Sequence, residues 1–130
     1  MNSEDFPPEF RDGARTIAID FDGVLHDDYL GFHDGSCYGD PIEGSLESIQ
    51  RLALTFRVVV FSAKARADRP LCNGLTGSDL IWGWLRKHGF ESHVAEVTSE
   101  KPRAELYVDD NGFRFGNWAE TISFIERELE

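Results

Sequence analysis

Residues 16–23 read Thr-Ile-Ala-Ile-Asp-Phe-Asp-Gly, a short apolar run that leads into two acidic residues and a glycine. The uninterrupted apolar run is typical of a short strand that is buried on both faces of a sheet. The run stops abruptly at Asp20 and Asp22, two acidic residues that packing alone does not explain. We therefore predict a buried strand that ends in a functional acidic loop.

The rest of the chain continues with alternating strands and helices. The expected strands cover residues 16–19, 58–61, 93–97 and 105–108, where short apolar runs occur. Helical spacing of apolar residues predicts three helices, which begin at the expected N-caps Ser45, Ser78 and Asn117. This alternation predicts an α/β domain of three layers, Rossmann-like, with a mostly parallel central sheet and helices on both faces.

Composition and charge favour one cytoplasmic domain. The 130 residues are 41% hydrophobic and 28% charged, which is ordinary for a single domain. A net charge of −11 disfavours non-specific binding to nucleic acid or to an anionic membrane. No apolar stretch approaches the ~20 residues of a membrane helix, and the N-terminus lacks a basic-then-apolar signal pattern. Cys37 and Cys72 are expected to be free thiols.

Two segments are expected to lie outside the regular elements. Residues 1–13 are polar and contain two adjacent prolines, which predicts a loosely ordered arm before a single domain at 14–130. Residues 25–44 have no sustained period and are rich in Gly, Asp and aromatic residues, which predicts a long loop, here called the flap. Loops of this length are usually functional, and the flap aromatics could close over a site.

Polar residues follow three of the expected strands. Asp20 and Asp22 follow the first strand, Ser62 the second, and Asp109 and Asp110 the last. In an open parallel sheet, ligands bind at the carboxyl ends of the strands. Four acidic groups gathered there would repel one another unless a cation lay between them, and all-oxygen ligands suit Mg²⁺. The sequence therefore predicts a magnesium site at this edge.

Basic residues lie near the same strand ends although the chain is acidic. Lys64 and Arg66 follow Ser62, and Lys101 precedes the last acidic strand. A locally positive mouth would attract an anionic substrate, and a carboxylate-bound Mg²⁺ beside it is typical of phosphate chemistry. An ordinary solvated loop is the alternative for Lys64 and Arg66.

Together these motifs resemble those of the haloacid dehalogenase-like (HAD) hydrolases. The elements are DFDGV at 20–24, a strand ending in Ser62, KP at 101–102 and YVDD at 107–110, in the order of that family and over most of the chain. Neither gap that holds a cap domain in the family has room for one here, so the resemblance is to the capless branch, with no separate cap domain. It implies a phosphatase that hydrolyses a small phosphorylated metabolite such as a nucleotide or a sugar phosphate.

The resemblance also implies a role for each motif residue. Asp20 would attack phosphorus and form an aspartyl-phosphate, and Asp22 would be the general acid and base. Ser62 would bind the transferring phosphoryl group, and Lys101 would neutralise Asp20 and that group.

The resemblance further implies which residues would hold the metal and the substrate. Mg²⁺ would be held by Asp20, the backbone carbonyl of Asp22 and Asp109, with Asp110 binding directly or through water. The expected substrate contacts are Gly23, Ser62, Ala63, Lys64 and Arg66.

Two other functions and one other metal remain as alternatives. A phospho-accepting signalling domain similar to response-regulator receivers uses the same residue types, although its motifs occur in another order. A catalytically silent HAD-like binding module fits the small size and the unusual flap. Zinc bound by His26, His33, Cys37 and the aspartates between them would not match a familiar spacing. If the partner is a nucleic acid, we expect the site to bind only its terminal phosphate. A neighbouring subunit could cover the open site.

Overall fold

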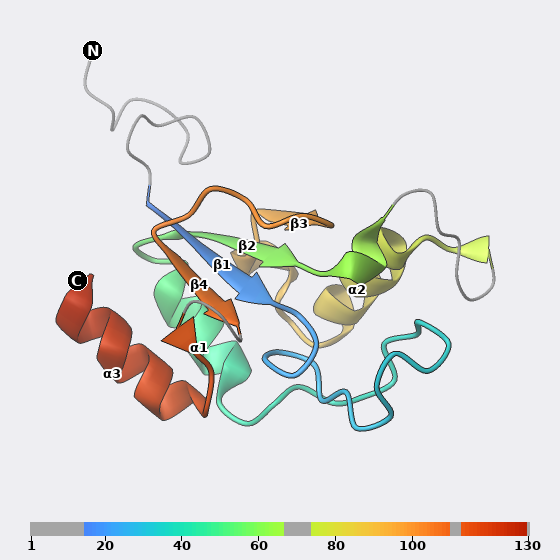
Figure 1. Cartoon of the computed structure of the whole chain (residues 1–130), viewed down its shortest axis with the longest axis horizontal. Helices are drawn as coiled ribbons and strands as arrows, with labels where there is room; N and C mark the ends of the chain where they lie inside the picture. Colours follow the sequence, from blue (N-terminus) through green and yellow to red (C-terminus); the bar gives the residue numbers. More distant parts are fainter. Residues whose placement is uncertain (1–14, 67–73, 110–112, 130) are drawn as a thin grey trace, which may run out of the picture.

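The computed structural model describes residues 15–66, 74–109 and 113–129, so the expected arm at 1–13 lies outside the described residues. A five-stranded sheet has the order β3-β2-β1-β4-β5, and every neighbouring pair is parallel. The strands are β1 (Thr16–Asp20), β2 (Arg57–Phe61), β3 (Glu96–Thr98), β4 (Leu106–Asp109) and the two-residue β5 (Phe113–Arg114). The expected α/β, Rossmann-like class with a parallel sheet is confirmed (Figure 1).

Three α-helices and two short 3₁₀ helices accompany the sheet. The α-helices are α1 (Ser45–Leu52), α2 (Gly77–Lys87) and α3 (Trp118–Glu128), and the 3₁₀ helices are η3 (Ala63–Ala65) and η5 (Glu91–His93). None of the helices in the described ranges is long and apolar enough to cross a membrane.

One of the three expected N-caps is confirmed and two are wrong. The side chain of Asn117 accepts a hydrogen bond from the Glu120 N–H at 2.9 Å and caps α3. Ser45 is instead the first residue of α1, which follows a left-handed Gly44. Helix α2 begins after Thr76 rather than at Ser78, because Thr76 and Asp79 form a reciprocal capping box.

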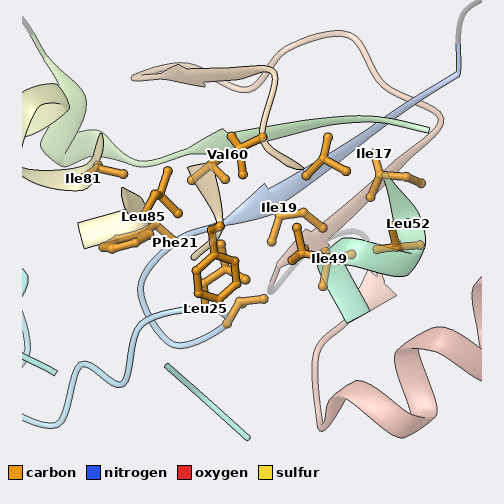
Figure 2. Packing of buried hydrophobic residues seen from close by; sticks show 14 of the residues in the cluster. Ile17, Ile19, Phe21, Leu25, Ile49, Leu52, Val60, Ile81 and Leu85 are labelled. Carbon is orange, nitrogen blue, oxygen red and sulfur yellow. The ribbon is translucent and has the colours of Figure 1, made fainter. Parts of the chain in front are cut away.

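The main core lies between one face of the sheet and the helices. Ile17 and Ile19 of β1 and Val60 of β2 belong to one buried cluster on this face. The helices contribute Ile49, Leu52, Ile81, Leu85 and Ile125 to the same cluster. Figure 2 shows the two α1 side chains beside those of β1, and the two α2 side chains near Phe21. The core thus joins the end of β1 to the helices that support the following loop.

Helices were expected on both faces, whereas the three described helices all contribute to this one cluster. The steps from β1 to β2 and from β2 to β3 move in the same direction across the sheet. Right-handed crossovers in one direction place their helices on the same face. The step back to β4 is made by residues 99–105, which contain no helix. The opposite face carries the buried Ala18 and Val59.

The flap leaves the carboxyl end of β1 and returns to α1. It consists of turns and isolated bridges, and in Figure 1 it is the blue-to-cyan loop that extends from the end of β1. Its two ends are joined by hydrogen bonds from Asp27 N–H to Asp40 O (3.0 Å) and from Ile42 N–H to Leu25 O (2.8 Å). The base of the flap is therefore anchored directly beside the acidic loop.

Candidate active site

The parallel register brings the predicted polar residues to one edge of the sheet. Asp20 is in register with Phe61, so Ser62 follows at the end of the neighbouring strand. On the other side Val108 is in register with Ile19, which places Asp109 next to Asp20. Because neighbouring strands lie about 4.8 Å apart, these three side chains share one small region.

A cavity of about 610 Å³ opens at this edge. It is lined by Asp20, Asp22, Asp28, Phe32, Phe61, Ser62, Ala63 and Lys64. Five of these residues were among the predicted site residues. Gly23 and Arg66 are both exposed and are not part of the lining. The structure therefore gathers the first two motifs around a single cavity formed by the β1 loop, the flap and η3.

Gly23 acts through the backbone of the acidic loop. It has a φ of 81°, a left-handed conformation that is costly for residues with a Cβ. Its N–H donates to the carbonyl of His26 at 2.9 Å, which closes a tight turn directly after Asp22. The glycine therefore shapes the loop that carries Asp22.

Asp22 is held by two side chains that meet at one of its oxygens. Its Oδ1 lies 2.8 Å from Nδ1 of His26 and 3.1 Å from Nζ of Lys64. Burial by itself raises the pKa of Asp22, but the hydrogen bond from His26 and the charge of Lys64 outweigh it, so the pKa is lowered below its ordinary value of 3.8. Asp22 is thus a carboxylate in the resting protein at neutral pH.

Ser62 and Lys64 form a compact anion-binding loop at the end of β2. The Ser62 hydroxyl caps η3 by accepting a hydrogen bond from the Lys64 N–H at 3.2 Å, which leaves its own proton available to a ligand. Lys64 is 4% exposed and its ammonium lies 5.9 Å from the centre of the Phe21 ring. A buried cation paired with Asp22 at the cavity wall can contact an incoming anion with little screening.

Lys101 reaches the site from the segment before β4. Its Nζ lies 2.5 Å from Oδ2 of the buried Asp109. The hydrogen bond with Asp109 is the main cause that raises the pKa of Lys101; partial desolvation opposes it, and the charges of Asp109 and Asp20 add to the rise. Lys101 is therefore within the electrostatic field of Asp20, while its direct ion pair is with Asp109.

The donor set at this edge fits a hard divalent cation. Asp20 and Asp109 bring carboxylate oxygens to adjacent strand ends, and Mg²⁺ often takes one or two carboxylates and completes its shell with water and phosphate oxygens. Across the described ranges, no group of three or more His, Cys, Asp or Glu side chains could by itself hold a metal ion. Asp110, the fourth predicted acidic residue, lies outside the described residues.

The zinc alternative finds no support in the flap. Both ring nitrogens of His26 are used in hydrogen bonds, to Asp22 and to the backbone of Gly39. Cys37 is partly buried in the flap, and Cys72 lies outside the part of the chain that the structure describes.

Two polar residues at the site were not assigned to it from the sequence, in which His26 was considered only as a possible zinc ligand. Asp28 lines the cavity, and His26 is fully buried against Asp22. The histidine follows Asp22 by four positions within a stretch interpreted only as a loop, so no periodic signal marked it. Its second partner, Gly39, is distant in sequence and becomes visible only when the flap closes on itself.

Comparison with known proteins gives one informative match. The chain is 33% identical over 106 residues to a bovine (Bos taurus) protein named phospholysine phosphohistidine inorganic pyrophosphate phosphatase. The match covers 78% of this chain, and the chain spans about a third of the length of that relative. No protein-family model matches the chain, and no solved structure matches it with significance.

Proposed function

We propose that the chain is a Mg²⁺-dependent phosphomonoester hydrolase of the HAD-like type that acts through an aspartyl-phosphate on Asp20. The observation that carries this proposal is the convergence of Asp20, Asp22, Ser62 and Lys64 on one cavity at the carboxyl end of a parallel sheet. Such an arrangement offers a nucleophile, a proton-transfer group and donors for a phosphoryl group in one place.

The similarity to a named phosphatase supports the general activity. It covers most of this chain but only part of the relative, so it bears on phosphatase chemistry rather than on the substrate of this protein. The capless architecture of the proposal rests on the short motif gaps in the sequence alone. A small phosphorylated metabolite is the proposed substrate, because the cavity has the size of an ordinary small-molecule site and is bordered by Phe32 and Phe61.

In the first step, a carboxylate oxygen of Asp20 attacks phosphorus and the bond from phosphorus to the leaving oxygen breaks. The leaving oxygen takes a proton from Asp22. The hydroxyl of Ser62 and the ammonium of Lys64 hold the phosphoryl oxygens, on which negative charge increases. Lys101 reduces the repulsion between that charge and the carboxylates at the sheet edge.

In the second step, Asp22 accepts a proton from a water molecule whose oxygen attacks the phosphorus of the aspartyl-phosphate. The bond from phosphorus to the Asp20 oxygen breaks, which releases inorganic phosphate and regenerates the Asp20 carboxylate. The lowered pKa of Asp22 keeps its carboxyl group ionised in the resting site, so the group is available to accept a proton. A bound phosphate anion beside Asp22 would raise its pKa, which favours the protonated form that the first step needs. One carboxyl group can therefore serve both steps.

The proposed cation would be held by Asp20, Asp109 and the backbone carbonyl of Asp22, with Asp110 as the further acidic ligand. When bound, Mg²⁺ supplies positive charge that offsets repulsion between the carboxylates and the phosphate. The ion pair of Lys101 with Asp109 occupies part of this donor set, so metal binding implies that Lys101 shifts toward Asp20 and the phosphoryl group.

The proposal is tested by replacing the nucleophile. We expect Asp20→Asn to lose the Mg²⁺-dependent release of phosphate from an aryl phosphate and from a panel of nucleotide and sugar phosphates, while its circular dichroism spectrum stays that of the wild type. Asp40→Asn, at an exposed acidic residue outside the cavity, is the matched control and should retain activity.

Other outcomes of this experiment would replace the proposal. Undiminished turnover by Asp20→Asn would reject Asp20 as the nucleophile. Stable phosphorylation without turnover would favour a phospho-accepting signalling domain. No release from any ester by the wild type would favour a silent binding module.

A further inference from the structure

We propose that His26 is a positioning residue that orients the Asp22 carboxylate for proton transfer and links it to the closed base of the flap. This inference rests on the proposed function, because it assigns His26 to the proton-transfer step of that reaction. His26 is fully buried, with Nδ1 2.8 Å from Asp22 Oδ1 and Nε2 2.9 Å from the backbone nitrogen of Gly39.

The two contacts determine where the proton of the imidazole lies. The Gly39 N–H can only donate, so Nε2 must accept and cannot carry a hydrogen. A neutral ring then carries its proton on Nδ1 and donates it to the carboxylate of Asp22. A doubly protonated ring would place two N–H groups head to head at Gly39. The geometry therefore assigns a neutral His26 that donates from Nδ1.

The ring is held in this orientation by its neighbours. It stacks on Phe21 with centroids 5.1 Å apart and an interplanar angle of 2°. The rings of Tyr38 and Trp84 make edge contacts with it at interplanar angles of 68° and 89°. Trp84 of α2 also donates its indole N–H to the Gly39 carbonyl at 2.8 Å. A continuous set of hydrogen bonds thus runs from α2 through the flap and His26 to Asp22.

This arrangement selects one oxygen of Asp22 for chemistry. His26 and Lys64 both bind Oδ1, and within the described residues Oδ2 has no hydrogen-bond partner. The oxygen that exchanges a proton with the leaving group or with water is therefore Oδ2. Without the His26 hydrogen bond, the carboxyl group could rotate or follow Lys64, and a small misplacement of a catalytic group is costly to the rate.

The simpler interpretation is that His26 only fills the core and holds the flap closed. Two substitutions separate these roles because each retains one of the two contacts. The amide nitrogen of His26→Asn can take the place of Nδ1 and donate to Asp22, while the longer side chain of His26→Gln can accept from Gly39 at the place of Nε2. If His26 has a purely structural role, the two variants should lose similar amounts of kcat/KM, or His26→Gln should lose less because it keeps the contact with Gly39.

The kinetic test compares kcat/KM for an aryl phosphate and an alkyl phosphate, since kcat/KM reports the step in which the ester bond breaks. An alkoxide is a poorer leaving group than a phenolate. Its departure therefore depends more on the proton that Asp22 supplies. We expect the kcat/KM of His26→Gln to fall about 10- to 100-fold for the alkyl ester and clearly less for the aryl ester. For His26→Asn we expect a smaller fall in kcat/KM for the alkyl ester. An equal loss on both esters, or a greater loss for His26→Asn than for His26→Gln, would overturn the proposal.

A spectroscopic test does not depend on activity or on the folding of a variant. In ¹⁵N-labelled wild type, long-range correlations of the histidine rings should show His26 protonated at Nδ1 and not at Nε2. As a control, His93→Gln, in η5, should leave these signals and the rates of hydrolysis of both esters unchanged. Protonation at Nε2 would reject the assigned hydrogen bond. If the wild type hydrolyses neither ester, the proposed function fails by itself, and this spectrum still decides the geometry of His26.

Discussion

Asp22 is a residue whose protonation depends on its neighbours. Burial favours the neutral acid, whereas the His26 hydrogen bond and the Lys64 ammonium favour the carboxylate, and the second effect is larger. The folded protein therefore binds a proton at this site less readily than the unfolded chain does. A difference of this sign links the stability of the protein to pH.

The stability contributed by ionised Asp22 should decline in acid. Because the folded-state pKa is lowered, this contribution is fully present above the ordinary value of 3.8 and is lost as the pH falls through the folded pKa. We expect the difference in free energy of unfolding between wild type and Asp22→Asn to shrink as the pH falls from about 6 to about 3. Urea unfolding of both proteins with EDTA present would measure it, and a difference that grows in acid would contradict the assigned direction.

Single residues differ in how far the sequence reveals them. Asp20 and Asp22 were recognisable because acidic residues directly after a buried apolar run stand out without any knowledge of contacts. His26 was not recognisable, since its function comes from Asp22 on one side and Gly39 on the other. Burial of a loop histidine depends on how the flap folds back, which no local pattern encodes.

At the scale of elements, the start of α2 determines how the helix meets the site. Thr76 Oγ1 accepts from the Asp79 N–H at 3.2 Å, and an Asp79 carboxylate oxygen accepts from the Thr76 N–H at 3.3 Å. Ser78 resembled a cap by residue type, yet it lies inside the first turn. The sequence placed the helix correctly and its first residue wrongly, because several adjacent residues are good caps and only tertiary packing selects among them.

This selection can be measured by a pair of alanine substitutions. We expect Thr76→Ala to reduce the free energy of unfolding by about 1 kcal/mol, since it leaves the Asp79 N–H without its acceptor. Ser78→Ala, the matched control, should change it by less than about 0.5 kcal/mol. Chemical denaturation of the two variants would show the difference, and equal effects would mean that the capping box does not stabilise the helix.

At the scale of the whole molecule, the candidate site exists because separate segments approach closely. The β1 loop, the flap, η3 and the segment before β4 each contribute one part. Strand ends and motif order predicted which strands meet, since parallel topology follows from simple rules. These rules did not predict that the three described helices lie on one face of the sheet, because residues 99–105 cross back without a helix. The ion pair of Lys64 with Asp22 likewise required the folded loop.

Helix α2 packs closely on η3, one of these segments, and this contact gives the last prediction. A Cβ at Gly77 would lie 1.4 Å from the carbonyl oxygen of Lys64, so Gly77→Ala must push α2 away from the loop that carries Ser62 and Lys64. We expect it to cost about 1–3 kcal/mol of stability and to lower kcat/KM. Gly83→Ala, in the same helix with open space around it, should instead stabilise by about 0.5–1 kcal/mol and leave activity unchanged. Thermal unfolding and phosphate release from the same two preparations would test both expectations, and a Gly77→Ala protein as stable and active as the wild type would show that the helix does not position this loop.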